Sequence, residues 1–259
     1  MRIPGGFEGV SAVGAHGFAR PEMAAWVENA LGRWGTLERA GRHDSAGEAL
    51  EGRGTVWVVP APAEGGRVAV RRYLRGGWVA GVLHDRYLRR GRSRAHMEAR
   101  ASDAARAKGI PTPRVEAGVL YPTGTLWYRA DLVTAYVPDS VDLARFLFER
   151  EAPTPDCPPD EAHRAGALAE AGRLARRLAE AGIYHPDLNA KNFLVTAGPE
   201  GPAVQVLDLD RARVTARAIS VAPMAARLTR SLRKFETIRG VALGERGWTA
   251  FRNATGGTS

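Results

Sequence analysis

Cysteine is nearly absent from this chain of 259 residues: Cys157 is the only one, so no disulfide can form within the chain. A single thiol fits a reducing compartment. Long apolar runs are missing as well, and no uncharged stretch approaches the ~18 residues that a membrane-spanning helix needs. Residues 1–6 do not resemble a signal peptide. We therefore expect a cytoplasmic protein that would meet a membrane only from its surface.

Lysine is also scarce, and arginine supplies almost all of the positive charge. The only lysines are Lys108, Lys191 and Lys234. Lysine and arginine together number 37 against 28 acidic residues, which gives a net charge of +9. Such a balance favours a polyanionic partner, which includes nucleic acid, nucleotide or an anionic membrane surface. The apolar fraction of 44% argues against disorder, and the length allows one large domain or two lobes.

The order of the expected elements divides the chain into three parts. Residues 1–50 are expected to form a helical N-terminal extension, with a helix over 20–31. Residues 51–138 are expected to form an antiparallel β lobe with one main helix, and residues 139–259 a mostly helical lobe. The expected strands are 55–59, 67–74, 114–120, 125–136, 193–195 and 204–207, and the other expected helices are 93–108, 141–150, 160–181 and 216–238. The sequence therefore predicts an α+β fold.

Residues 185–192 read His-Pro-Asp-Leu-Asn-Ala-Lys-Asn, and a short strand then leads to Asp208 and Asp210. A carboxylate such as Asp187 can accept the proton of a hydroxyl group. The amide oxygen of Asn192 and the carboxylate of Asp208 are the hard oxygen ligands that Mg²⁺ prefers. The alternative interpretation is local capping by Asp187 and turn chemistry at Asn192. The role of Asp210 is open between the metal site and an ion pair with a neighbouring arginine.

This pattern resembles the protein-kinase arrangement of His-x-Asp, Asn five positions later, and then a metal-binding Asp. The resemblance implies a two-lobed protein-kinase-like fold. Kinases also hold the α- and β-phosphates with a cation on a β-strand, paired to a helix glutamate. Arg71 occupies the lysine position here and Glu98 is the candidate partner, although Glu98 could instead be a solvated helix charge. Gly52 and Gly54 could let backbone N–H groups approach the ATP phosphates, or could form an ordinary turn.

Two departures from protein kinases concern the acceptor. Pro186 replaces the arginine of His-Arg-Asp, which normally receives a phosphorylated activation loop. No Ala-Pro-Glu sequence follows Asp208, and few residues separate Asp208 from the final helix. The chain therefore offers little platform for a peptide, and a small or glycolipid hydroxyl acceptor is favoured.

Several segments resemble the 3-deoxy-D-manno-octulosonic acid (Kdo) kinases of the lipopolysaccharide-core kinase group, over about residues 52–234. These segments are 70–77, 85–88, 109–113, 128–134, 184–192 and 208–211, together with Glu98. The resemblance implies an enzyme that uses ATP and Mg²⁺ to phosphorylate the 4-hydroxyl of Kdo on a lipid A precursor. It also implies a peripheral location on the cytoplasmic side of the inner membrane. Asp187 would be the base, Asn192 and Asp208 the metal ligands, and Arg71 with Glu98 the nucleotide-binding pair.

Three alternatives remain open. One is another core sugar, such as heptose, as acceptor. The second is a catalytically silent nucleotide-binding scaffold. The third, a nucleic-acid-binding module, would explain the charge but not the acidic residues, and we expect no nucleic acid partner. The basic loop 75–94 and the cationic final helix could contact phosphorylated lipid A or an anionic leaflet, or could be a solvated arginine-rich face. The sequence leaves the oligomeric state undetermined.

Overall fold

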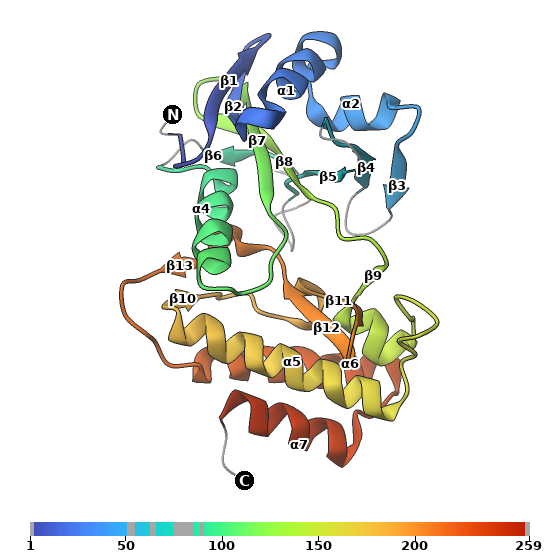
Figure 1. Ribbon diagram of the computed structural model, residues 1–259. Coiled ribbons are helices and arrows are strands. Elements are labelled where there is room, and N and C mark those ends of the chain that lie inside the picture. Colours follow the sequence, from blue (N-terminus) through green and yellow to red (C-terminus); the bar gives the residue numbers. More distant parts are fainter. Residues whose placement is uncertain (1–2, 51–54, 63–65, 75–84, 89–90, 257–259) are drawn as a thin grey trace. The chain divides into compact units, whose positions relative to one another are not determined.

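The computed structural model describes residues 3–50, 55–62, 66–74, 85–88 and 91–256 (Figure 1). The chain divides into two compact units. Unit 1 contains residues 1–100 and 114–136, and unit 2 contains residues 101–113 and 137–259. Each unit has its own hydrophobic core, so the two are described in turn.

Unit 1 is built on an eight-stranded sheet in the order β1-β2-β7-β8-β5-β4-β3, with β6 also paired to β8. Every pairing is antiparallel. The strands are β1 (Glu8–Ala12), β2 (Ala15–Ala19), β3 (Glu48–Leu50), β4 (Val56–Pro60), β5 (Arg67–Arg72), β6 (Tyr87–Leu88), β7 (Val115–Thr123) and β8 (Trp127–Ala135). The four strands expected from the sequence in this region are β4, β5, β7 and β8.

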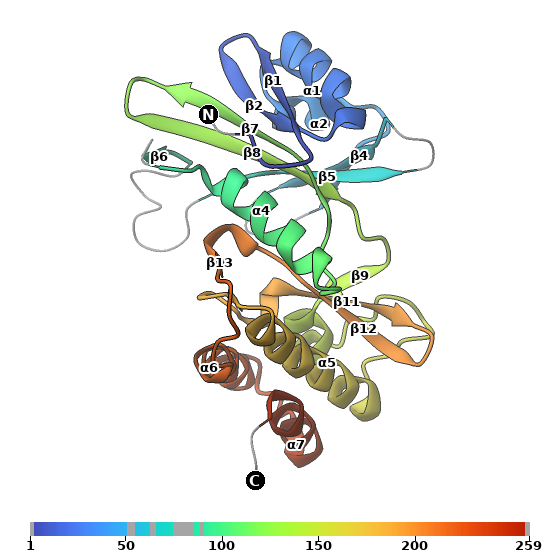
Figure 2. The ribbon, with the colours of Figure 1, turned by 60° about the vertical axis from the view of Figure 1, so that its left-hand side comes forward.

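Residues 1–50 belong to this sheet as well as to two helices. The hairpin of β1 and β2 adds to the edge of β7, which the sequence pattern did not indicate. Helices α1 (Pro21–Trp34) and α2 (Leu37–His43) then pack on one face of the sheet (Figure 2). Val27 and Leu31 of α1 meet Val70 and Val133 of the sheet in one apolar cluster. Residues 1–50, expected to form a helical N-terminal extension, lie in unit 1 together with the strands that follow them.

Helix α4 (Arg94–Ala107) begins in unit 1 and ends in unit 2. Ser93 caps it, because its Oγ accepts a hydrogen bond from the His96 backbone N–H at 3.2 Å. Ala95 and Ala99 pack with Phe18 and Leu132 in a second apolar cluster. The two clusters place α4 on the sheet face opposite to α1 and α2.

Unit 2 combines helices with short β-ladders. Its elements are β9 (Ser140–Asp142), a π-helical turn η1 (Arg145–Glu149), α5 (Glu161–Glu180), β10 (Ile183–Tyr184), η2 (Ala190–Asn192), β11 (Phe193–Gly198), β12 (Gly201–Val206), η3 (Leu209–Arg211), β13 (Arg213–Val214), α6 (Ala222–Arg239) and α7 (Gly244–Thr255). The strand order in the larger sheet is β12-β11-β9. The helix expected over 141–150 is shorter: Val141 pairs with Val195 of β11 as part of β9, and helical structure covers residues 143–149. Within the described ranges, no helix has the length and apolarity to cross a membrane.

The core of unit 2 is organised by α5, which buries a stripe of alanine and leucine that includes Leu168, Leu174 and Leu178. Asp160 caps this helix by accepting from the His163 backbone N–H at 2.8 Å. Gly172 lets α7 approach closely, since a Cβ at this position would lie 2.9 Å from the Cβ of Ala254 and 3.1 Å from the carbonyl oxygen of Phe251.

This close approach predicts opposite effects for the same substitution at two helical glycines. Gly172→Ala should lower the free energy of unfolding by about 1–3 kcal/mol, because the added methyl group overpacks the α5–α7 contact. Gly32→Ala, on the exposed side of α1 with no atom within 4 Å of the new Cβ, should raise it by about 0.5–1 kcal/mol. Urea denaturation of both variants measures the two changes, and equal effects of the same sign would contradict the packing described here.

Candidate active site

The loop between β10 and β11 folds around the backbone carbonyl of Asp187. Nδ2 of Asn189 donates to this carbonyl at 2.7 Å and Nδ2 of Asn192 at 3.0 Å. Oδ1 of Asn189 accepts from the backbone N–H of Lys191 at 3.0 Å and so begins η2. Because Nδ2 of Asn192 is engaged, Oδ1 of the same amide points the other way and can act as a hard oxygen ligand.

His185 ties this loop to the segment that carries Asp208. Its ring is fully buried, and Nε2 lies 3.1 Å from the carbonyl oxygen of Leu207. Burial lowers the pKa of His185, so the neutral ring donates from Nε2. His185 therefore orients the loop relative to the segment that leads to Asp208.

Asp208 lies just beyond the β11–β12 hairpin, next to Asn192. The backbone N–H of Leu207 donates to the carbonyl of Asn192 at 2.8 Å, one step past the pairing of Phe193 with Val206. Asp208 adopts a left-handed backbone, with φ 60° and ψ 54°, that is uncommon for a residue other than glycine. Such conformations are concentrated at functional sites. The turn directs the chain into η3.

An ion pair joins η3 back to the candidate base. Nη1 of Arg211 lies 2.6 Å from Oδ2 of Asp187, and these side chains are 56% and 40% exposed. An exposed pair adds little stability, so its main effect is to orient the carboxylate and leave Oδ1 open. Asp187, Asn192 and Asp208 are thus brought together within unit 2. Asp210 is buried, and its neighbour Arg211 pairs with Asp187. Both interpretations of Asp210, the metal site and an ion pair with an arginine, therefore stay open.

Arg71 and Glu98 form the corresponding pair in unit 1. Nη2 of Arg71 lies 2.5 Å from Oε1 and 2.7 Å from Oε2 of Glu98. The hydroxyl of Tyr73 donates to Oε2 of Glu98 at 2.5 Å, and the Arg71 guanidinium lies over the Tyr73 ring at 4.9 Å. Glu98 is only 5% exposed, so the interpretation of Glu98 as a solvated helix charge was wrong.

The remaining predicted positions fall elsewhere. Gly52 and Gly54 lie outside the described residues, as do residues 75–84 and 89–90 of the basic loop. Among the residues that the structure describes, no three His, Cys, Asp or Glu side chains gather as a metal-binding group. One carboxylate and one amide are nevertheless a usual protein contribution to a Mg²⁺ site, because substrate phosphates and water supply the other ligands.

Comparison with known proteins identifies the family. Residues 39–254 match the lipopolysaccharide kinase (Kdo/WaaP) family. The chain belongs to this family. The chain is 36% identical over 191 residues to a 3-deoxy-D-manno-octulosonic acid kinase of Stenotrophomonas maltophilia, covering 73% of this chain and 69% of that one. It is 38% identical over 165 residues to a protein of the same name from Xanthomonas oryzae pv. oryzae, covering 62% and 58%.

The fold comparison agrees with the sequence comparison. A solved structure of WaaP in complex with acyl carrier protein matches with a TM-score of 0.50 and 19% sequence identity, covering 81% of this chain and 78% of that one. The protein-kinase-like fold predicted from the sequence is therefore confirmed. Membership of the Kdo/WaaP family also confirms the prediction of a sugar kinase that uses ATP as a substrate.

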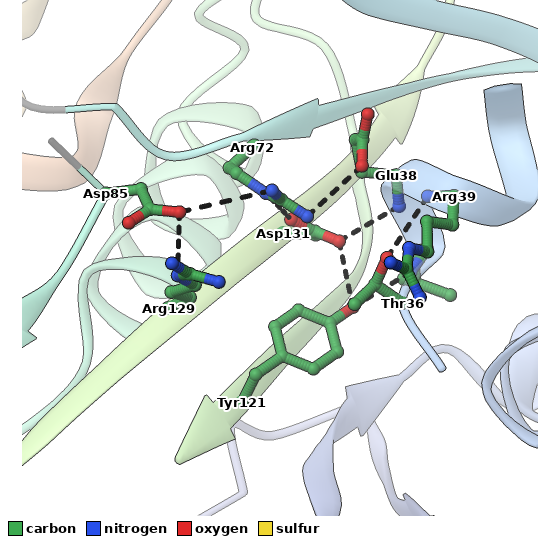
Figure 3. Close-up of polar contacts among 9 residues, drawn as sticks. Thr36, Glu38, Arg39, Arg72, Asp85, Tyr121, Arg129 and Asp131 are labelled. Atoms are coloured by element: carbon green, nitrogen blue, oxygen red, sulfur yellow. Dashed lines mark hydrogen bonds and ion pairs between the residues drawn. The ribbon is translucent and has the colours of Figure 1, made fainter. Parts of the chain in front are cut away.

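A buried polar network in this Kdo/WaaP-family kinase was missed by the sequence analysis (Figure 3). Asp131 of β8 has 0% exposure, and its carboxylate accepts from Nε of Arg72 at 3.3 Å, the hydroxyl of Tyr121 at 2.9 Å and the backbone N–H of Glu38 at 2.9 Å. Burial raises the pKa of Asp131 despite the nearby charge of Arg72. Burial, followed by the charge of Asp131, also raises the pKa of Tyr121, so the tyrosine remains a hydroxyl donor.

The network continues to Asp85, which lies within the basic loop 75–94. Nη2 of Arg72 lies 3.2 Å from Glu38, and its Nη1 lies 4.0 Å from Asp85, which pairs with Nε of Arg129 at 2.7 Å. Burial lowers the pKa of Arg72, but the charges of Asp131 and Glu38 outweigh burial and raise it. Arg72, Asp85, Arg129 and Asp131 all occur in the segments that resemble Kdo kinases. One available signal was a carboxylate inside an apolar strand, which needs buried donors.

Removal of the buried Asp131 carboxylate should strongly destabilise the fold. Asp131→Ala should reduce the free energy of unfolding by about 3–5 kcal/mol, because it leaves Arg72 and Tyr121 without their buried acceptor. Asp131→Asn keeps one acceptor oxygen, so its free energy of unfolding should fall by less than that of Asp131→Ala. Glu48→Ala, which breaks the exposed pair with Arg67, is the control and should change stability by about 1 kcal/mol or less. If chemical denaturation gave similar values for Asp131→Ala and Glu48→Ala, Asp131 would not be the anchor described here.

Proposed function

We propose that this kinase transfers the γ-phosphoryl group of ATP to the 4-hydroxyl of Kdo on a lipid A precursor. The observation that carries the proposal is the grouping of Asp187, Asn192 and Asp208 around one loop, in a chain whose relatives are named as Kdo kinases. Those names favour Kdo over heptose as the acceptor sugar. The intact set of oxygen groups argues against a silent nucleotide-binding scaffold.

In the proposed reaction, Oδ1 of Asp187 accepts the proton of the acceptor hydroxyl as its oxygen bonds to the γ-phosphorus. The bond from that phosphorus to the bridging oxygen breaks, and ADP leaves with the electron pair. Arg211 holds the other oxygen of the Asp187 carboxylate, which fixes the orientation of the base. Most of the rate in phosphoryl transfer comes from such positioning and from charge neutralisation.

The remaining groups serve the nucleotide. Oδ1 of Asn192 and the carboxylate of Asp208 have the donor chemistry for Mg²⁺, which when bound would neutralise charge on the phosphates. The Arg71 guanidinium provides a planar fork for the α- and β-phosphates, and Glu98 with Tyr73 fixes its position. We assign Gly52 and Gly54 to the same phosphates on their sequence pattern alone.

Because the acceptor is a membrane glycolipid, we place the enzyme at the cytoplasmic face of the inner membrane as a peripheral protein. Exposed basic residues of α6, such as Arg230 and Lys234, supply charge for an anionic leaflet, each worth about 1 kcal/mol near such a surface. Recovery of the protein only in the soluble fraction of gently lysed producing cells would count against this location.

The metal assignment predicts a specific loss. Asp208→Asn should reduce kcat at least about 10²-fold, because it removes the charged ligand that holds the metal near the phosphates. The unfolding midpoint should stay near that of the wild type, since the side chain is nearly isosteric. Glu170→Gln on the exposed face of α5 is the control and should retain full activity. Near-normal turnover of Asp208→Asn would refute the assignment.

The acceptor assignment predicts a defined product. Incubation of the purified enzyme with Kdo–lipid A precursor and ATP should add one phosphate, seen by mass spectrometry, and fragmentation should place it on the 4-hydroxyl of Kdo. A heptose-bearing core acceptor is the comparison substrate. If phosphate appeared on heptose alone, heptose would replace Kdo as the proposed acceptor. ATP binding without transfer to either sugar would support the silent nucleotide-binding scaffold.

A further inference from the structure

A small cavity in unit 1 lies apart from the Arg71–Glu98 pair. It has a volume of about 270 Å³ and lies between residues 3–5 and the first half of α4. The described residues that line it are Ile3, Pro4, Gly5, Arg92, His96 and Arg100. His96 and Glu98 are two positions apart on α4, and side chains at that spacing do not face each other. The cavity is therefore distinct from the nucleotide-binding pair.

The charge of this cavity is of one sign. Among the six lining residues that the structure describes, two are arginines, a third is a histidine, and none is acidic. Arg92 and Arg100 make no ion pair or hydrogen bond with any part of the chain that the structure describes, whereas Arg67, Arg72 and Arg114 are all paired. Arg92 and Arg100 line the same cavity, so their like charges repel each other, and a bound anion would reduce that repulsion.

The walls of the cavity are fixed by aromatic packing. The ring of His96, only 3% exposed, lies edge-on to Phe18 with 6.4 Å between centroids, and Phe18 packs against Phe7 at 5.0 Å. The Arg20 guanidinium lies 3.9 Å from the centre of the Phe7 ring, and its Nη1 donates to the carbonyl of Gly6 at 3.3 Å. These contacts hold the two walls together, so a ligand would have to order only the exposed side chains of Arg92 and Arg100.

We propose that this cavity binds a phosphomonoester group. Two guanidinium forks match the geometry and charge of a phosphate dianion better than those of a neutral ligand. The volume lies below the range of about 300–1,000 Å³ for whole drug-sized ligands. The cavity therefore suits a single phosphate group, carried either by a membrane lipid or by a small soluble compound. The proposal does not depend on the identity of the acceptor sugar.

Binding of two probes to the full chain tests this site, with ADP and Mg²⁺ present to fill the nucleotide site. The soluble probe is inorganic phosphate, followed by calorimetry at constant ionic strength. The membrane probe is a phosphatidylcholine vesicle with or without phosphatidic acid, whose headgroup is a phosphomonoester. The test variant is R92Q/R100Q. The matched control is R39Q/R42Q, which removes the same charge from exposed positions of α2 that have no ion pair in the described structure.

The pocket variant should lose at least about ten-fold in affinity for one probe, because charge-assisted hydrogen bonds are lost, while the control should lose less than about two-fold. In the wild type, the same probe should shift the NMR signals of the His96 ring, and the shift should vanish in R92Q/R100Q. Loss confined to inorganic phosphate identifies a soluble ligand, and loss confined to phosphatidic acid vesicles identifies a headgroup. Equal losses in both variants, or no binding of either probe by the wild type, would overturn the proposal.

Discussion

A carboxylate without any exposure to water, that of Asp131, constrains the architecture of unit 1. Taking such a charge out of water is costly unless several donors surround it. The donors come from three segments far apart in the sequence: the start of α2, β5 and β7. The position of Asp131 in β8 therefore fixes where the N-terminal residues lie against the sheet. It explains why residues 1–50 belong to unit 1.

The same network constrains the strand that carries Arg71. Successive side chains on a strand point to opposite faces, so Arg71 and Arg72 serve different purposes. Arg72 lies opposite Asp131 in the β5–β8 register and enters the network, while Arg71 reaches Glu98 on α4. A shift of β5 by one residue would exchange these faces and break both sets of contacts. The proposed phosphate-binding arginine is thus held by an ion pair on its own face and by its neighbour on the other.

The sequence predicted those parts of the molecule that depend on local spacing. Asp187 and Asn192 lie five positions apart in one loop, and their hydrogen bond follows from that short separation. The strands β4, β5, β7 and β8 were also predicted, because each is a run rich in β-branched and apolar residues. The contacts of Asp131 with Arg72 and Glu38 could not be predicted in this way, since these donors lie 59 and 93 residues away along the chain. Nothing in the local pattern shows which distant residue will meet a buried charge.

The two groups of proposed active-site residues are each assembled by contacts inside their own unit. In unit 2, the neutral His185 ring and the backbone of Asn192 both bond to Leu207, which fixes Asp208 relative to the loop. In unit 1, Glu98 is held by Arg71 of β5 and by Tyr73, which directly follows that strand. A substitution in one group should therefore alter nucleotide or acceptor chemistry without unfolding the other. Each proposed group therefore owes its geometry to hydrogen bonds within its own unit.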